Sequence, residues 1–305
     1  MQSIILTGAT GMLGTAVIAE CIKNGISVTA VARPSSYRLG RIPKSGSVTV
    51  IECGLDNMHK LPALVTGKHD AFYHLGWLGT SKSERNDPAI QELNVKYTLD
   101  AVNVADELGC GLFLGAGSQA EYGRYDVPIK EDFETKPDTA YGRAKLSACK
   151  SSAELCGRLK IKHVWTRIFS VYGPNDSPST MVMYFIGRLL DNQRASLSKC
   201  TQIWDYMYCS DAARALLLAG EKGGGGRIYN VGNGIGRPLI EYVNILRDAI
   251  DPAAVLGIGE LKQVGKLMNL CADITKIKKD TSFKPMVPFE RGIEETIKWY
   301  RENIK

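Results

Sequence analysis

The chain has 305 residues, of which 44% are hydrophobic and 23% are charged, and its formal net charge is +6. This composition is typical of a globular protein and excludes an intrinsically disordered chain. No apolar run is long enough to cross a membrane, and no basic stripe is interleaved with aromatic residues, so we expect neither a membrane nor a nucleic acid as partner.

The eight cysteines and four histidines are scattered along the chain, and no Cys-x-x-Cys pair occurs. Such spacing is typical of reduced, buried thiols and does not match the ligand spacing of zinc sites, so we expect no metal. The first apolar strand begins almost at Met1, which leaves no room for a signal peptide. We therefore expect a cytoplasmic protein.

The first element is the stretch IILTGATGMLG, residues 4–14. Its apolar start predicts a buried strand, and a helix with apolar positions follows from Met12. Between them, Gly8 allows a tight turn, Gly11 lets the backbone approach a pyrophosphate, and Gly14 lets the helix lie close to the strand. Because the free N–H groups at such a helix start face phosphates, this stretch predicts dinucleotide binding.

The second predicted strand covers residues 28–32 and ends where the cofactor ribose would lie. NAD-preferring folds of this kind end the strand with an acid that binds the ribose hydroxyls, whereas here Ala32 is followed by Arg33, with Ser36 near by. An arginine fork suits a 2′-phosphate, so we predict NADP as the cofactor. The alternative is an NAD enzyme in which Arg33 stacks on adenine.

Farther along the chain, strand and helix patterns alternate, which is typical of a parallel sheet with helices on both faces. The further predicted strands cover residues 48–53, 71–75, 112–115, 163–169 and 227–231, and the long helices cover residues 88–108 and 140–159. Asp138 and Thr139 are N-cap candidates for the later of these helices.

After residue 169 the pattern changes. The next eleven letters, SVYGPNDSPST, predict turns, a helix is predicted over residues 181–190, and residues 238–305 are largely helical. We predict a doubly wound Rossmann-type parallel sheet with a smaller, mainly helical C-terminal substrate lobe. The predicted dinucleotide-binding domain covers residues 1–169 with a returning segment at about 205–232, and the predicted lobe covers residues 170–204 and 233–305.

A second chemical motif, YGRAK, opens the helix over residues 140–159. Its spacing places Tyr141 and Lys145 on one helical face, where a cation lowers the pKa of a phenol. Upstream, the letters GAGS leave the end of a strand and project the Ser118 hydroxyl toward the same edge. A serine, a tyrosine and a lysine beside a nicotinamide can polarise a carbonyl and move its proton.

The motifs TGATGMLG, GSQAEYG, YGRAK, RIFSVYGP, WDYMYCSD and YNVGNG together resemble the extended short-chain dehydrogenase/reductase family, and within it the nucleotide-sugar epimerase/dehydratase group. The resemblance covers nearly the whole chain. It implies that Tyr141 is the general acid/base, that Ser118 hydrogen-bonds the substrate oxygen, and that Lys145 holds the nicotinamide ribose. It also implies a nucleotide-sugar substrate and a homodimer packed through the two long helices.

The motifs and the resemblance together assign the site residues. The expected catalytic residues are Ser118, Tyr141 and Lys145. The expected cofactor-binding residues are Gly8, Thr10, Gly11, Met12, Leu13, Gly14, Arg33, Ser36, Leu75, Gly76, Tyr141, Lys145 and Phe169. The expected substrate-binding residues are Trp77, Ser118, Gln119 and Ser170.

Departures from the family pattern narrow the expected reaction. Sugar 4,6-dehydratases of the group follow the catalytic hydroxyl with an Asp-Glu pair, where this chain has Gln119 and Ala120, so dehydration is not expected. Many epimerases carry Asn in place of Ser170 and Arg in place of Trp204, so the contacts to the sugar diphosphate must differ.

We predict an NADPH-dependent 4-ketoreductase of a keto-deoxy sugar nucleotide. The main alternative is a nucleotide-sugar 4-epimerase with bound NAD. Two further alternatives are a reductase of a non-nucleotide ketone and a non-catalytic, cofactor-sensing relative, a class that usually loses the tyrosine or the lysine.

Overall fold

The computed structural model describes residues 1–81, 84–262 and 268–304. Within this part of the chain, a 7-stranded sheet has the strand order β11-β6-β5-β4-β1-β2-β3. Its strands are β1 (Ser3–Thr7), β2 (Ser27–Ala32), β3 (Val48–Glu52), β4 (Ala71–His74), β5 (Leu112–Ser118), β6 (Lys162–Ile168) and β11 (Arg227–Val231). Every neighbouring pair is parallel, which confirms the predicted doubly wound Rossmann-type fold.

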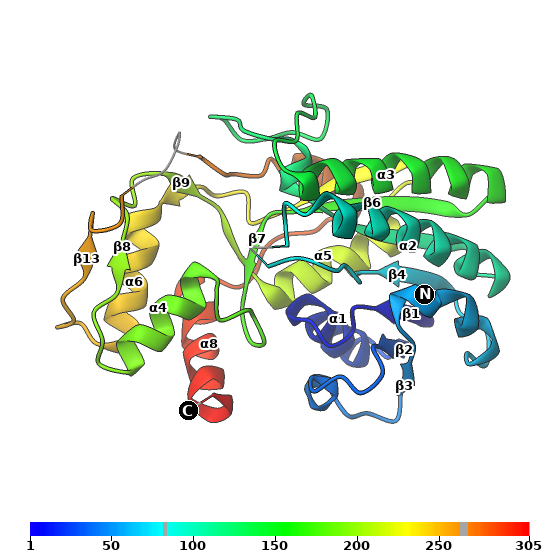
Figure 1. Ribbon diagram of the computed structural model, residues 1–305, viewed down its shortest axis with the longest axis horizontal. Coiled ribbons are helices and arrows are strands. Elements are labelled where there is room, and N and C mark those ends of the chain that lie inside the picture. Colours follow the sequence, from blue (N-terminus) through cyan, green and yellow to red (C-terminus); the bar gives the residue numbers. More distant parts are fainter. Residues whose placement is uncertain (82–83, 263–267, 305) are drawn as a thin grey trace.

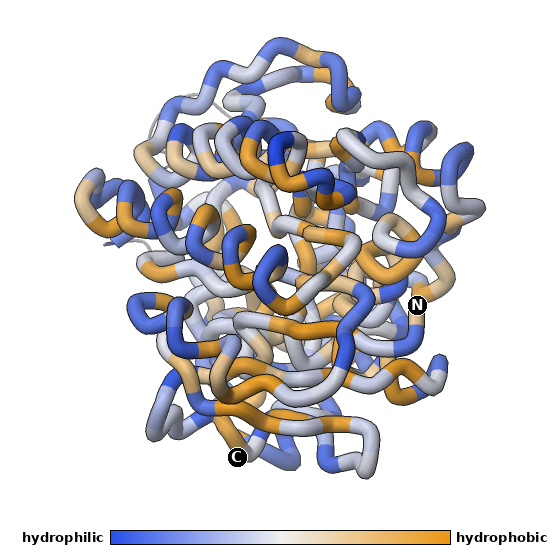
Figure 2. The backbone as a smooth tube through the Cα atoms, turned by 90° about the vertical axis from the view of Figure 1, so that its right-hand side faces the viewer, coloured by the Kyte–Doolittle hydropathy of each residue, from blue (hydrophilic) through white to orange (hydrophobic). Residues whose placement is uncertain are grey.

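Helices cover both faces of the sheet (Figure 1). Helices α2 (Pro88–Glu107) and α3 (Ala140–Leu159) lie on one face, and α1 (Met12–Lys23) and α5 (Cys209–Lys222) lie on the other. Short 3₁₀ turns are η1 (Leu39–Arg41), η2 (Leu55–Ala63) and η3 (Gln119–Glu121). Each face buries its own apolar core, and the helix tubes alternate between hydrophobic and hydrophilic along their length, as expected of amphipathic helices (Figure 2).

The starts of the two long helices follow from local capping. Asp87 caps α2, since its carboxylate accepts from the backbone N–H groups of Ala89 and Ile90 at 3.0 and 3.3 Å. Thr139 caps α3 by accepting from Gly142 N at 3.0 Å. Of the two N-cap candidates, Thr139 is confirmed, whereas Asp138 pairs with Arg124 at 3.1 Å.

A second lobe packs around α4 (Met181–Leu190), α6 (Leu239–Ile250) and α8 (Phe289–Asn303), which share one apolar core. It lies beside the sheet at the left of the view (Figure 1). Three short strand pairs accompany these helices: β7 (Ser170–Tyr172) with β10 (Tyr206–Tyr208), β9 (Ile203–Trp204) with β12 (Arg237–Pro238), and β8 (Ser196–Leu197) with β13 (Gly257–Ile258). Because these strands have only two or three residues each, the lobe is mainly helical.

The structure differs from the sequence pattern in three segments. Residues 170–172, predicted to begin a turn-rich stretch, form β7 because β10 supplies a hydrogen-bonding partner. Helix α5 has no counterpart among the predicted helices. Helix α7 (Thr275–Thr281) falls in the predicted substrate lobe, but Ile274, Ile277 and Phe283 pack in the Rossmann core. Residues 263–267 and 305 of the predicted helical stretch lie outside the described residues.

All eight cysteines are free thiols and buried. Within the described ranges, no group of three or more His, Cys, Asp or Glu residues could hold a metal ion. None of the helices described is both long and apolar enough to cross a membrane.

Candidate functional site

A cavity of about 1080 Å³ lies between the carboxyl edge of the sheet and the helical lobe. This is where open parallel sheets bind ligands, near the point at which the strand order reverses between β1 and β4. The predicted site residues that line it are Gly8, Gly11, Leu13, Gly14, Leu75, Trp77, Ser118, Gln119, Tyr141, Lys145, Phe169 and Ser170. The predicted residues outside its lining are Thr10, Met12, Arg33, Ser36 and Gly76.

The turn from β1 to α1 forms a cradle at one end of the cavity. Gly8 has a φ of +71°, and a Cβ there would lie 2.7 Å from the carbonyl carbon of Leu75. A Cβ at Gly14 would overlap the carbonyl oxygen of Gly8, so the helix can lie this close to the turn only with glycine. Gly11 caps α1 without a side-chain hydrogen bond, and the first turn carries no acid. The open N–H groups therefore fit the pyrophosphate of a dinucleotide.

The loop after β2 holds the residues predicted to contact the 2′ position. Arg33 is exposed, and its side chain has no hydrogen-bond or ion-pair partner among the described residues. The neighbouring Ser35 has a φ of +54° and donates its N–H to the Glu52 carboxylate at the end of β3, at 2.7 Å. A free guanidinium and a carboxylate thus flank this end of the predicted cofactor site.

The structure brings the three predicted catalytic residues together at the cavity. Ser118 ends β5, and its Oγ accepts from Ala120 N at 3.2 Å, which leaves the hydroxyl hydrogen available. The side chain of Tyr141, the second residue of α3, forms a hydrogen bond with Ser118. Lys145 follows one turn later on the same helix.

Burial is the largest influence on the Tyr141 phenol and raises its pKa. The opposing cation is Arg85, whose guanidinium carbon lies 4.2 Å from the centre of the Tyr141 ring. The sequence pattern predicts this effect for Lys145, but the Lys145 nitrogen lies 5.8 Å from the ring centre. Arg85 comes from an irregular loop, so no helical or strand spacing could indicate it.

Lys145 is anchored from two sides. Its Nζ donates to the Ala116 carbonyl at 2.6 Å and lies 3.5 Å from the centre of the Trp77 ring. Trp77 in turn donates its indole N–H to Gln91 at 2.9 Å. Burial lowers the pKa of Lys145 to about 7, while the Glu121 carboxylate acts in the opposite direction.

The substrate end of the cavity contains further polar groups, of which Gln119 is a predicted substrate-binding residue, whereas Gln202 and Asp176 are not predicted. The buried atoms without a partner in the described structure include Oε1 of Gln119, Oε1 of Gln202 and Nε1 of Trp204, and these three residues line the cavity. Burial raises the pKa of Asp176, also in the lining, to about 6. Because unpaired buried polar atoms are costly, the three unpaired groups are suited to hydrogen-bond a ligand.

The family model for the NAD dependent epimerase/dehydratase family matches residues 4–232. The chain belongs to this family. The match spans the Rossmann sheet, the glycine turn and the Ser118, Tyr141 and Lys145 positions. It also confirms the resemblance to the nucleotide-sugar epimerase/dehydratase group.

The proteins with similar sequences include enzymes that are named for reactions of nucleotide sugars. The chain is 25% identical to a UDP-N-acetyl-alpha-D-glucosaminuronate decarboxylase of Bacillus cytotoxicus, over 98% of this chain and 97% of the relative. It is also 25% identical to a UDP-glucuronate 4-epimerase of Thermodesulfobacterium geofontis, over 100% of this chain and 98% of the relative. The protein is accordingly an enzyme of the short-chain dehydrogenase/reductase type.

Solved structures share the fold. The UDP-glucose 4-epimerase of Thermotoga maritima, determined with UDP-glucose, has a TM-score of 0.88 and 23% identity and covers 100% of both chains. A UDP-glucose 4-epimerase of Thermus thermophilus in complex with NAD has a TM-score of 0.86 and 21% identity, and covers 99% of this chain and 100% of that one. At this identity the likeness establishes the fold.

Proposed function

We propose that this enzyme is a nicotinamide-dependent 4-ketoreductase of a nucleotide sugar. The observation that carries the proposal is the meeting of Ser118, Tyr141 and Lys145 at one cavity, with Gln119 and Ala120 following the serine. An amide and a methyl group cannot transfer protons for water elimination. The site is therefore equipped for hydride and proton transfer at one carbon and oxygen pair. The named relatives act on UDP sugars, which supports this substrate class.

A nicotinamide dinucleotide held at the turn of Gly8, Gly11 and Gly14 would supply the hydride for the carbonyl carbon. Tyr141 donates its phenolic proton to the carbonyl oxygen, so that ketone, hydride and proton together give an alcohol. Ser118 donates its hydroxyl hydrogen to the same oxygen and polarises the carbonyl. Since burial raises the pKa of Tyr141, the phenol carries its proton at neutral pH, which is the form that reduction requires.

A 4-epimerase is the second candidate, and the epimerases among the relatives and structural neighbours favour it. Such an enzyme oxidises its substrate first and returns the hydride to the opposite face of the sugar. The deciding assay mixes the protein with a 4-keto sugar nucleotide and NADPH. A reductase oxidises NADPH in equal amount to the alcohol formed, whereas an epimerase copurifies with NAD and interconverts two sugars without net cofactor consumption.

We propose NADP(H) as the preferred cofactor because Arg33 is unpaired and no acid ends β2. Arg33→Ala is expected to weaken NADPH binding by roughly 10-fold or more and to leave NADH binding nearly unchanged, since only the 2′-phosphate pairs with the guanidinium. Dissociation constants from fluorescence titration measure both. Arg143→Ala, which removes an exposed positive charge from α3, is the matched control. Equal affinities for the two cofactors that Arg33→Ala leaves unchanged would mean an NAD enzyme.

We further propose a cytoplasmic homodimer that packs through α2 and α3. The proposal rests on the family resemblance and on the position of these two helices side by side on one face of the sheet (Figure 1). Light scattering of the purified protein gives the mass directly. A monomer at all accessible concentrations would exclude the dimer.

A further inference from the structure

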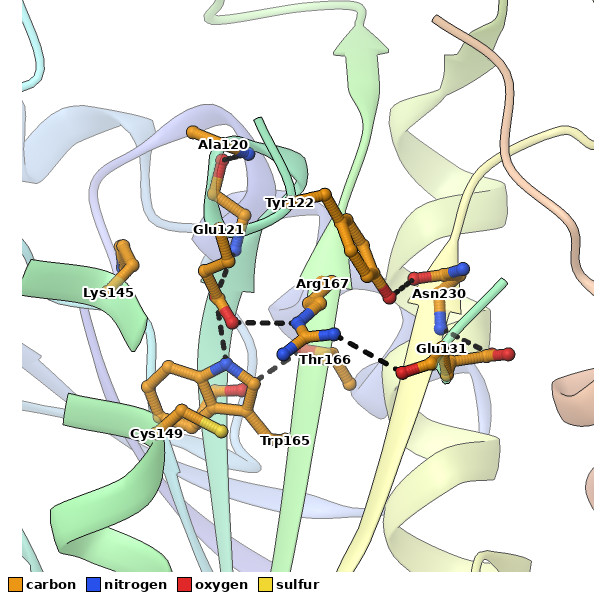
Figure 3. Close-up of polar contacts among 12 residues, drawn as sticks. Ala120, Glu121, Tyr122, Glu131, Lys145, Cys149, Trp165, Thr166, Arg167 and Asn230 are labelled. Carbon is orange, nitrogen blue, oxygen red and sulfur yellow. Dashed lines mark hydrogen bonds and ion pairs between the residues drawn. The ribbon is translucent and has the colours of Figure 1, made fainter. Parts of the chain in front are cut away.

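Three residues after the serine of the site, the Glu121 carboxylate is paired with Trp165 and Arg167 (Figure 3). Glu121, the last residue of η3, is 0% exposed. Its Oε1 accepts from Ser118 N at 2.9 Å and from the Trp165 indole N–H at 3.0 Å. Its Oε2 accepts from Nε of Arg167 at 2.7 Å, and this guanidinium is also buried. Both carboxylate oxygens thus accept hydrogen bonds in the interior.

The strand in front of Glu121 leaves room for this arrangement. A Cβ at Gly117 would overlap both the indole nitrogen of Trp165 and the carboxylate of Glu121. A larger residue at this position of β5 would therefore push the carboxylate away from the serine. The close approach of the Trp165 and Glu121 side chains thus explains why residue 117 is a glycine.

The contacts form a capping box that fixes Ser118. Glu121 accepts from the serine backbone N–H, and the serine Oγ accepts from Ala120 N at 3.2 Å. The backbone of Ser118 is held extended, with φ −149° and ψ 150°. Because Ala120 N donates to the serine oxygen, the hydroxyl hydrogen of Ser118 is left to donate to Tyr141 or to a substrate oxygen.

Glu121 also shapes the electrostatics around Lys145. It favours the ammonium form of Lys145, whereas Arg85, from the loop before α2, disfavours it. His74 of β4 is close enough to feel the Lys145 charge, but burial lowers the pKa of His74 to about 3, so it stays neutral. Tyr141, on the same helix, is neutral because burial raises its pKa. The Glu121 carboxylate is therefore the charge that opposes loss of the Lys145 proton.

We propose that Glu121 is a positioning residue of the catalytic site: its carboxylate holds the Ser118 turn and supplies a negative charge that favours the ammonium form of Lys145. The role in turnover rests on the proposed function, whereas the effect on Lys145 does not.

The chain offers a matched control in the same polar network (Figure 3). The Glu131 carboxylate accepts from Asn230 N at 2.9 Å, and its carbonyl accepts from Nη1 of Arg167 at 3.5 Å. Glu131 is partly buried, and among the described residues it makes no hydrogen bond or ion pair with Ser118 or Lys145. Glu131→Gln thus removes a network carboxylate without touching the site.

The test compares Glu121→Gln with Glu131→Gln by two measurements. Trace acetylation of Lys145 across pH, quantified by mass spectrometry, reports the pKa of Lys145 without any substrate. The pH profile of kcat reports the reaction. Because removing a negative charge disfavours the ammonium, Glu121→Gln should move the Lys145 pKa and the alkaline limb of kcat to lower pH by about 1 unit. It should also lower kcat at least 10-fold at the optimum, while Glu131→Gln leaves both near the wild-type values.

A Lys145 acetylation profile that is the same in Glu121→Gln and the wild type would overturn the proposal, as would equal shifts in both variants. If the wild type turns over no keto sugar nucleotide, the proposed function fails, but acetylation still decides the charge role. If Glu121→Gln does not fold, Glu121→Asp takes its place. The Glu121→Asp variant keeps the negative charge, but its side chain is too short to hold Ser118. We therefore expect kcat to fall while the pH profile of Lys145 acetylation stays as in the wild type. Wild-type kcat in this variant would refute the positioning role.

Discussion

Turnover of the Tyr141→Phe variant is expected to fall by at least two orders of magnitude, while cofactor binding is retained. The substitution keeps the ring, which packs edge-on against Trp77 at 6.0 Å between centroids, and removes only the hydroxyl. Without it, the carbonyl oxygen loses its proposed general acid, and general acid catalysis of this kind contributes about 10²- to 10⁴-fold. Steady-state kinetics and cofactor titration separate the two effects.

Tyr184→Phe is the matched control for this prediction. Tyr184 also lines the cavity but lies on α4 and is 38% exposed, so its hydroxyl is not expected to take part in proton transfer. Near-normal kcat in Tyr141→Phe on a genuine substrate would show that another group is the acid/base. Equal losses in both variants would point to general damage to the cavity.

Arg167→Met is expected to lower the free energy of unfolding by about 3–5 kcal/mol, because it leaves a fully buried carboxylate without its cation. The ion pair joins Nε of Arg167 to Oε2 of Glu121 at 2.7 Å, with the two side chains 4% and 0% exposed. In this environment the unpaired charge keeps its desolvation cost and loses its Coulomb partner. Urea unfolding followed by circular dichroism measures the loss.

Two further variants serve as controls for the unfolding measurement on Arg167→Met. The double variant Glu121→Leu/Arg167→Met removes both charges and should recover much of the stability, since buried pairs are often replaceable by apolar side chains. Arg124→Met breaks an ion pair with Asp138 whose side chains are 50% and 49% exposed, and its cost should stay below about 1 kcal/mol. A loss in Arg167→Met as small as in Arg124→Met would mean that the buried pair does not stabilise the fold.

Local patterns in the sequence were sufficient for the architecture and for the frame of the site. Strands and long helices follow from apolar periodicity, and the turn at Gly8 follows from a backbone conformation that glycine adopts readily. Tyr141 and Lys145 share a helical face because they are four residues apart in one helix. These features depend on residues near one another in the chain, so a single sequence contains them.

Only the tertiary structure decided what surrounds those residues. Glu121 meets Arg167 because β5 and β6 pair with Gly117 opposite Arg167, a register that joins segments about 50 residues apart. Arg85 reaches the Tyr141 ring from an irregular loop, and Asp176 enters the cavity from the turn after β7. The burial that raises the pKa of Tyr141 and lowers that of Lys145 likewise arises only on folding, when residues distant in the chain such as Trp77 pack against both side chains. Contacts of this kind depend on strand register and packing, which periodicity and residue spacing do not encode.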